Sequence, residues 1–267
     1  YNLTQKLGEG GMGTVYHAHD RLTGQAVALK LVSANPLNLR TNSRSSNPSN
    51  DPNLSLAHEF QMMASLRHPH IITVLDYGFG RDSQPFFTMT LLENAQTFLQ
   101  AAHNQTLKTK VELTIQVLQA LAYIHRRDIL HRDLKPSNVL VKDGHAHVAD
   151  FGLAQTPDDA HAGIAGTLAY MSPEVLMGEL PSKASDLFAL GVMLYEIISG
   201  KHPFVKDNVT ETITAILSQD PLWDALDVSL DLVMVIQRLL EKSSADRYQT
   251  ATEVIKALSE AIGIPLS

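Results

Sequence analysis

Residues 131–138 read His131-Arg132-Asp133-Leu134-Lys135-Pro136-Ser137-Asn138. This stretch carries a candidate proton acceptor (Asp133), a candidate phosphate-binding cation (Lys135) and a candidate metal ligand (Asn138). Any one of these residues alone is typical of a polar surface loop. A loop does chemistry only where rigid elements hold it, so the flanking sequence decides between the two interpretations.

A second motif, Asp-Phe-Gly at residues 150–152, follows downstream. Together the two motifs resemble the catalytic loop and the metal-binding turn of the protein kinases. A lysine two places after Asp133 is the form seen in the serine/threonine kinases. The resemblance implies that Asp133 accepts the proton of the attacking hydroxyl and that Lys135 neutralises charge on the γ-phosphate. It also implies that Asn138 and Asp150 hold Mg²⁺, with Mn²⁺ as the alternative.

Residues 8–13 read Gly-Glu-Gly-Gly-Met-Gly and lie between strand-like stretches. This string alone equally suits a dinucleotide-binding turn, but that fingerprint opens a helix. Here β-branched and aromatic residues follow at once, which predicts a hairpin. The hairpin resembles the kinase glycine-rich loop, whose backbone N–H groups cover the ATP phosphates. The resemblance implies ATP contacts by Leu7, Gly8, Gly10, Gly11 and Gly13.

Residues 27–30 read Val-Ala-Leu-Lys and resemble the third kinase strand. A lone lysine at the end of a strand is usually a solvated charge. After a glycine-rich hairpin, the resemblance implies that Lys30 holds the α- and β-phosphates of ATP. Residues 56–67 have apolar residues at helical spacing, which predicts an amphipathic helix. Within this helix, Glu59 takes the place of the family glutamate that pairs with the strand lysine.

The resemblance also implies an adenine site. Its residues are Val15, Ala28, Leu140, Met89, Thr90 and Leu92. The first three would sandwich the ring, and Met89 falls at the family's gatekeeper position. The last two would offer a backbone C=O and a backbone N–H to the adenine edge.

The resemblance implies an α+β fold of the bilobal protein kinase type. Residues 1–92 would form a small N-lobe with a five-stranded antiparallel sheet and one helix. Residues 93–267 would form a larger, mainly helical C-lobe. Residues 34–54 are rich in Asn, Ser, Pro and Arg with little to bury, so we expect a disordered insertion there.

Two predicted helices frame the catalytic stretch. The first ends near His125, and its expected apolar face consists of Val111, Ile115, Leu118 and Ala122. The second covers residues 185–199, is apolar nearly all round, and should be fully buried up to Gly200. A buried charge at its start, Asp186, is costly unless hydrogen-bonded. The family's use for this aspartate is to hold the backbone of the His-Arg-Asp turn.

The segment between Asp150 and Glu174 resembles the kinase activation segment. The resemblance implies that Thr167 bonds Asp133 and Lys135 and shapes the site for the acceptor hydroxyl. It also implies a buried, structural ion pair between Glu174 and Arg247.

Arg132 presents a departure from the family pattern. In many kinases of this type, the arginine of His-Arg-Asp binds a phosphate on the activation segment. Between Thr156 and Thr167 this chain has no Ser, Thr or Tyr, and it has Asp158 and Asp159 instead. We therefore expect the segment to be ordered without phosphorylation there, with an aspartate or a partner surface serving Arg132.

The composition disfavours several function classes. A formal charge of -7 argues against a nucleic-acid binder, and the absence of cysteine excludes disulfides and cysteine zinc sites. Two of the twelve histidines, His145 and His147, alternate along a predicted strand, which disfavours a zinc site. No signal peptide or bilayer-long apolar run is present, so we expect a cytoplasmic kinase domain with any membrane anchor outside residues 1–267. The missing initiator methionine suggests a domain of a longer protein.

The resemblance thus implies an ATP- and Mg²⁺-dependent serine/threonine protein kinase that also autophosphorylates and acts in signalling. The wording of residues 7–16 is most similar to the bacterial members of the family. Expected partners are proteins carrying Ser or Thr; a regulatory partner, further domains or a second copy are additional candidates. The main alternative is a pseudokinase scaffold that binds nucleotide without catalysis. A pure interaction module is a weaker alternative, and Thr167 with residues 172–174 disfavours a small-molecule kinase.

Overall fold

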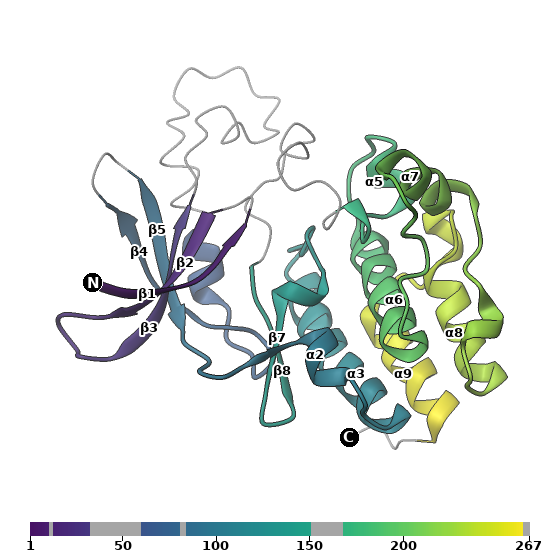
Figure 1. Ribbon diagram of the computed structural model, residues 1–267, viewed down its shortest axis with the longest axis horizontal. Helices are drawn as coiled ribbons and strands as arrows, with labels where there is room; N and C mark the ends of the chain where they lie inside the picture. Colours follow the sequence, from purple (N-terminus) through teal and green to yellow (C-terminus); the bar gives the residue numbers. More distant parts are fainter. Residues whose placement is uncertain (11–12, 33–59, 81–83, 151–167, 264–267) are drawn as a thin grey trace. The chain divides into compact units, whose positions relative to one another are not determined.

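The computed structural model describes residues 1–10, 13–32, 60–80, 84–150 and 168–263 (Figure 1). These residues form two compact units, one within residues 1–93 and the other from Asn94 onward. The predicted insertion at residues 34–54 lies outside the described ranges. Within those ranges, no helix is both long enough and apolar enough to cross a bilayer.

The first unit contains the predicted five-stranded antiparallel sheet, in the order β1-β2-β3-β5-β4. Its strands are β1 (Asn2–Gly10), β2 (Gly13–His19), β3 (Ala26–Val32), β4 (Val74–Phe79) and β5 (Pro85–Thr90). Gly10 pairs with Gly13 at the end of the β1–β2 ladder, so the glycine string joins two paired strands. The hairpin prediction is confirmed, and the dinucleotide-binding alternative, which requires a helix at this point, is excluded.

A helix, of which the structure describes residues 60–65, packs on this sheet through Phe60. The centroid of the Phe60 ring lies 5.5 Å from those of both Phe87 and Tyr77. The helix was predicted over residues 56–67, and its first four residues lie outside the described ranges. Its predicted end is wrong, because the helix stops at Ser65. Arg67 lies beyond the end and donates hydrogen bonds to the carbonyls of Ala64 (2.7 Å) and Leu66 (2.8 Å), which caps the last turn.

The second unit combines a small three-stranded sheet with a set of helices (Figure 1). The strands are β6 (Gln96–Thr97), β7 (Val139–Lys142) and β8 (His145–Val148). The helices are α2 (Phe98–Ala102), α3 (Leu107–His125), α5 (Pro173–Leu176), α6 (Lys183–Ser199), α7 (Val209–Ser218), α8 (Leu230–Leu239) and α9 (Ala251–Ile262). Helix α3 packs against β8, α6 and α9, and α6 also packs against α8. The predicted α+β class is therefore confirmed.

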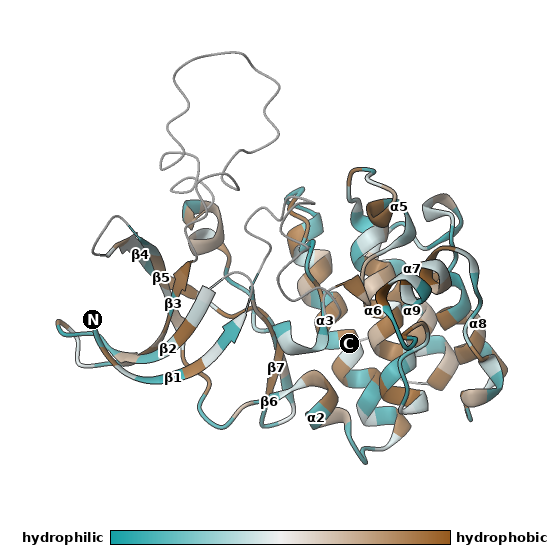
Figure 2. Cartoon of the chain, turned by 45° about the horizontal axis from the view of Figure 1, so that its top comes forward, coloured by the Kyte–Doolittle hydropathy of each residue, from teal (hydrophilic) through white to brown (hydrophobic). Residues whose placement is uncertain are grey.

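Helix α3 ends at His125 as predicted, but its predicted apolar face is only partly correct. Ile115 and Ala122 are half-buried, whereas several residues outside the predicted face are fully buried. The buried residues are Val111, Leu113, Thr114, Val117, Leu118, Ala120, Leu121, Ile124 and His125. Because α3 has neighbours on three sides, its buried stripe is wider than a single row of apolar residues. The bands of apolar and polar residues can be followed in Figure 2.

Helix α6 is buried on nearly all sides, as its sequence predicts. Gly200 ends it with φ 73°, a left-handed conformation that glycine adopts without strain. Inside the helix, Gly191 faces α8 so closely that an added Cβ would lie 2.7 Å from the Cβ of Leu239. Helix α6 therefore approaches α8 at a point where only glycine fits.

Gly191→Ala is expected to lower the free energy of unfolding by about 1–3 kcal/mol, because the new methyl group overpacks the contact with Leu239. In a helix without this contact, the same change would stabilise by about 1 kcal/mol through helix propensity. A urea titration followed by circular dichroism measures the difference. An increase in stability would show that α6 and α8 are not this close.

Candidate active site

Residues 131–138 follow α3 as an irregular loop, which ends in a short 3₁₀ turn over Pro136–Asn138. His131 is fully buried and holds this loop through two hydrogen bonds. Its Nδ1 accepts a hydrogen bond from the Asp133 N–H (3.3 Å), so its Nε2 carries the proton and donates to the Ala149 carbonyl (3.1 Å). Burial lowers the pKa of His131, which favours this neutral form. His131 therefore supports the loop and is not a catalytic base.

Asp133 lies at the centre of a compact polar cluster and is 6% exposed. Lys135 Nζ lies 3.1 Å from its Oδ1 and 2.9 Å from its Oδ2. The Asn138 side-chain amide donates to both the Asp133 backbone carbonyl (2.8 Å) and its Oδ2 (3.0 Å). The structure thus brings together three of the residues that the sequence assigns to catalysis and metal binding, on one loop.

The orientation of Asn138 bears on metal binding. Because both atoms of Asp133 that it contacts are acceptors, the amide must face them with its nitrogen. Its oxygen therefore points away from Asp133 and keeps its lone pairs for another partner. An amide oxygen and a carboxylate oxygen, from Asn138 and Asp150, are the hard donors that Mg²⁺ prefers. The donor set fits such an ion.

Asp150 is the one residue of the Asp-Phe-Gly motif that the structure describes, and its φ is 51°. Arg132 has φ 66°. Positive φ is uncommon for residues other than glycine, and such strain persists only where surrounding contacts enforce it. Two strained residues thus lie in the two motifs that resemble the family's catalytic machinery. Phe151 and Gly152 lie outside the described residues.

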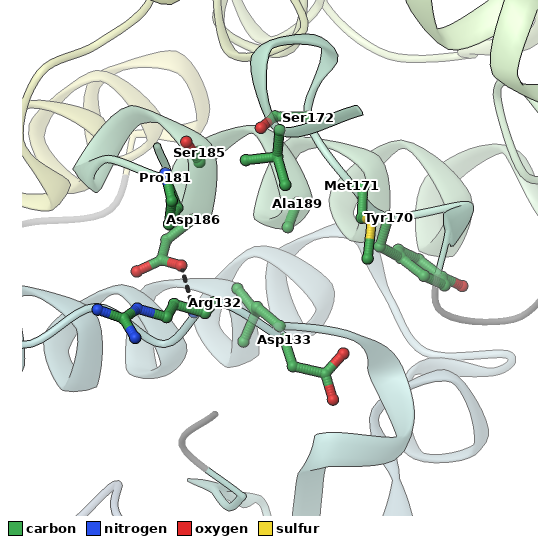
Figure 3. Close-up of a pocket in the computed structure, with 11 residues that line it drawn as sticks. Arg132, Asp133, Tyr170, Met171, Ser172, Pro181, Ser185, Asp186 and Ala189 are labelled. Atoms are coloured by element: carbon green, nitrogen blue, oxygen red, sulfur yellow. Dashed lines mark hydrogen bonds between the residues drawn. The ribbon is translucent and has the colours of Figure 1, made fainter. Parts of the chain in front are cut away.

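Asp186, in the first turn of α6, holds the strained loop in place. It is 3% exposed, and its Oδ2 accepts from the His131 N–H (2.8 Å) while its Oδ1 accepts from the Arg132 N–H (2.9 Å; dashed line in Figure 3). The prediction that Asp186 holds the backbone of this turn is confirmed. His125 adds a third bond through Nε2 (2.8 Å to Oδ2), and sequence reasoning missed it.

The Arg132 side chain is exposed, in contrast to its backbone. In the described ranges, its guanidinium forms no ion pair with any carboxylate. The aspartates expected to serve it, Asp158 and Asp159, lie outside the described residues, as does Thr167. The expected ordering of that segment without phosphorylation stays a prediction.

In the first unit, four of the predicted nucleotide residues share one face of the sheet. Val15 pairs with Lys30, and Ala28 pairs with Met89. Directly paired residues and residues two apart on a strand point to the same face, so these four side chains lie together. Lys30 is 4% exposed, with Nζ 6.0 Å from the centroid of the Phe87 ring.

The other predicted nucleotide residues are not among these four paired side chains. Leu7, Gly8 and Gly10 are exposed on β1. Gly13 opens β2 with φ 134°. Thr90 ends β5, Leu92 follows it half-buried, and Leu140 lies half-buried on β7 in the second unit. Gly11 and Glu59 lie outside the described residues.

The predicted ion pair of Glu174 and Arg247 is confirmed. The guanidinium is fully buried and donates to both Glu174 carboxylate oxygens (2.8 and 2.7 Å). Its remaining N–H groups donate to the backbone carbonyls of Glu241, Ala184 and Lys242, so all five donors are used. Ser185, which the sequence did not single out, adds a hydrogen bond to Glu174 Oε1 (2.7 Å).

A pocket lies between the loop of residues 131–138 and the residues that precede and follow α5 (Figure 3). Arg132, Asp133 and Asp186 line it on one side. The chain from Tyr170 to Ser172 lines it on another. Ser172 replaces the alanine of the family's Ala-Pro-Glu pattern and is 2% exposed. Its hydroxyl forms no hydrogen bond with any residue that the structure describes.

Ser172→Ala is expected to raise the free energy of unfolding by about 1 kcal/mol, because it removes a buried hydroxyl that lacks a partner. The matched control is Ser185→Ala, which removes a buried hydroxyl that donates to Glu174 and should lower stability. Urea titrations of both variants measure the two signs. A loss of stability in both would mean that Ser172 has a partner after all.

His125 could have been found from its place in the sequence. It is the last helical residue of α3 and lies six positions before His131, so its side chain is expected close to the same loop. Ser172 and Ser185 carry no comparable signal, because buried and exposed serines look alike in a sequence.

Comparisons with known proteins show which family the chain is similar to. A family model described as the protein kinase domain matches residues 1–258. A probable serine/threonine-protein kinase of Streptomyces coelicolor is 33% identical over 95% of this chain and 38% of its own length. The serine/threonine-protein kinase PknB of Mycobacterium leprae is 32% identical over 95% of this chain and 42% of its own length. These relatives are bacterial, and the chain spans about two fifths of their length.

Proposed function

Because the chain belongs to the protein kinase domain family, we propose that it transfers the γ-phosphoryl group of ATP to serine and threonine hydroxyls of proteins. Kinases of this family use ATP and a divalent metal ion in general. The observation that carries the proposal is the cluster at Asp133, where a buried carboxylate is held between Lys135 and Asn138. A scaffold without catalysis has no need of this arrangement.

Asp133 is proposed to orient the acceptor hydroxyl and to take its proton. Its carboxylate is fixed from two sides, by the Lys135 ammonium and by the Asn138 amide, so little reorganisation is needed when the hydroxyl arrives. Lys135 is half-buried beside it, and we propose that its charge stabilises the transferring phosphoryl group. Thr167 is proposed to bond both residues.

Asn138 and Asp150 are proposed to hold Mg²⁺, with Mn²⁺ as the alternative. When bound, the ion supplies positive charge that neutralises the phosphate oxygens. The chain's own contribution is to keep the Asn138 oxygen turned away from Asp133, as its amide contacts require. The strained backbone of Asp150 supports the same role, because such strain is typical of functional positions.

The nucleotide is proposed to bind through the shared face of the first sheet. Lys30 would contact the phosphates and pair with Glu59, while Val15, Ala28 and Met89 would contact adenine together with Leu140. The backbone of Thr90 and Leu92 would bond the adenine edge. The glycine-rich loop would cover the phosphates through Leu7, Gly8, Gly10, Gly11 and Gly13. The pairing of Val15 with Lys30 and of Ala28 with Met89 supports this assignment.

Further proposals concern the chain as a whole. We propose that residues 1–92 and 93–267 act as the two lobes of the kinase, and that residues 34–54 are an insertion in the sequence of the first. Protein substrates carrying Ser or Thr are the proposed partners, with autophosphorylation, a regulatory partner and a homodimer as further expectations. A cytoplasmic location is proposed for this domain.

The proposed function is tested by incubating the protein with γ-labelled ATP, Mg²⁺ and a generic protein substrate. Label on phosphoserine and phosphothreonine is expected, and the Asp133→Asn variant should incorporate far less. Equal incorporation by both proteins would reject Asp133 as the base. No incorporation by either, with ATP still bound in a thermal-shift assay, would favour the pseudokinase scaffold.

A further inference from the structure

Tyr170 connects the pocket beside Asp133 to a group of side chains outside the catalytic cluster. With Met171 it lies across the pocket from Pro181 (Figure 3). Residues 170–172 line this pocket together with Asp133, whose carboxylate is proposed to receive the acceptor hydroxyl. The position of Tyr170 therefore helps to set the shape of this pocket.

Two contacts fix the Tyr170 side chain. Its hydroxyl donates a 2.6 Å hydrogen bond to Glu196 Oε2, near the end of α6. Its ring meets the His202 ring edge-on, with centroids 5.0 Å apart and an interplanar angle of 81°. The hydroxyl contact restrains the far end of the side chain, and the ring contact restrains its body.

His202 is itself fixed to the core. Its Nδ1 accepts hydrogen bonds from the N–H groups of Phe204 and Val205, each 3.1 Å long. The Phe204 ring is fully buried and stacks on Phe188 of α6, with centroids 6.1 Å apart. A continuous series of contacts thus leads from the core through His202 to Tyr170.

The imidazole of His202 has the charge state that these contacts require. Burial lowers the pKa of His202 to about 4, so the ring is neutral at physiological pH and Nδ1 keeps the lone pair that accepts the two N–H groups. Glu196, which faces the other end of Tyr170, has its pKa raised by burial. A protonated His202 could not accept these bonds, and the loop before α7 would lose its anchor.

We propose that His202 is a positioning residue for the protein substrate: it holds Tyr170, and through it residues 170–172, in the conformation that receives the acceptor segment beside Asp133. This inference rests on the proposed kinase function. The ring contact with Tyr170 carries the positioning role, and the Nδ1 contacts carry the stability of the loop. The two roles belong to different parts of one side chain, so different substitutions separate them.

His202→Asn keeps an acceptor near the position of Nδ1 and removes the ring edge from Tyr170. It is expected to raise KM for a serine/threonine peptide roughly tenfold, because the acceptor surface loses its support. KM for ATP should stay within about twofold of the wild-type value, since the nucleotide contacts proposed above involve none of these residues. His202→Phe keeps a ring and loses the acceptor. It should lower the melting temperature more than His202→Asn while changing peptide KM less.

A double-mutant cycle tests whether His202 acts through Tyr170. In a Tyr170→Leu background, His202→Asn should have no further effect on peptide KM, because the ring contact is already absent. His103→Asn, at an exposed histidine of the same unit, is the matched control and should leave both KM values unchanged. Independent, multiplicative effects of the two substitutions would overturn the proposal.

Two other outcomes are equally decisive. An unchanged peptide KM in His202→Asn, or equal proportional changes in the KM values for peptide and ATP, would reduce His202 to a structural residue and overturn the proposal. In both cases the wild-type protein still transfers phosphate, so the proposed function survives. Absence of transfer by the wild-type protein would instead overturn both.

Discussion

Replacing Asp133 by asparagine is expected to lower kcat for phosphate transfer by about 10³-fold, within the range measured for loss of a general base. Asparagine has nearly the same shape, and its oxygen can still accept from Lys135, so the loop should keep its conformation. What it loses is the charge and the basicity needed to take the hydroxyl proton. Affinity for ATP should change little, because Asp133 is proposed to contact the acceptor and not the nucleotide.

Single-turnover kinetics with labelled ATP measure this loss, and a thermal-shift titration measures nucleotide affinity. Asp143→Asn is a matched control, because Asp143 is an exposed turn residue whose φ of 51° suits asparagine equally well. It should leave kcat unchanged. A loss below about tenfold in Asp133→Asn would show that proton transfer to this carboxylate contributes little to the rate.

Arg247→Met is expected to lower the free energy of unfolding by about 3–5 kcal/mol, because it leaves the buried Glu174 carboxylate without its bidentate partner. Three backbone carbonyls also lose their donors. The double variant Arg247→Met with Glu174→Leu should recover part of the loss, because both buried charges are then gone. Urea titrations of the two variants and the wild type measure the three stabilities.

Lys183→Met is the matched control for this prediction. Lys183 forms an exposed pair with Asp128 at 3.3 Å, and exposed pairs of this kind contribute at most about 1 kcal/mol. A similar small effect for Arg247→Met would show that solvent reaches the buried pair.

The pair with Arg247 also predicts a pH dependence of stability. Burial alone would raise the pKa of Glu174, but the hydrogen bonds from Arg247 and Ser185 outweigh it and hold that pKa below its usual value. A depressed pKa stabilises the folded state above the unfolded-state pKa, and this contribution is lost as the pH falls through the folded-state value. The free energy of unfolding should therefore fall less on acidification in Arg247→Met than in the wild type.

The sequence was sufficient to predict what depends on motif and periodicity. The hairpin at residues 8–13, the buried helix at residues 185–199 and the hydrogen bonds of Asp186 and Glu174 all follow from patterns within one stretch or from a family resemblance. The hairpin and the helix are local features. The hydrogen bonds of Asp186 and Glu174 join residues that are distant in the sequence, and the family resemblance implies these contacts.

Features that depend on how many neighbours an element has were harder to predict. Ile115 and Ala122 fit a one-sided helix, but α3 packs on three sides, so its buried stripe shifted and widened. The end of the helix at Ser65 depends on Arg67 turning back onto the last carbonyls, which spacing alone does not reveal. Ser172 is noticeable only once it is known that its hydroxyl has no hydrogen bond to any described residue.

The bonds from the His131 and Arg132 amides to Asp186 have a consequence for dynamics. Because α6 is part of the core, these amides should exchange with solvent only when that helix opens, on the timescale of the most stable part of the unit. The exposed turn at residues 143–144 should exchange far sooner. The segment that carries the carboxylate proposed to be catalytic is thus a loop in its geometry, but it should unfold together with the core.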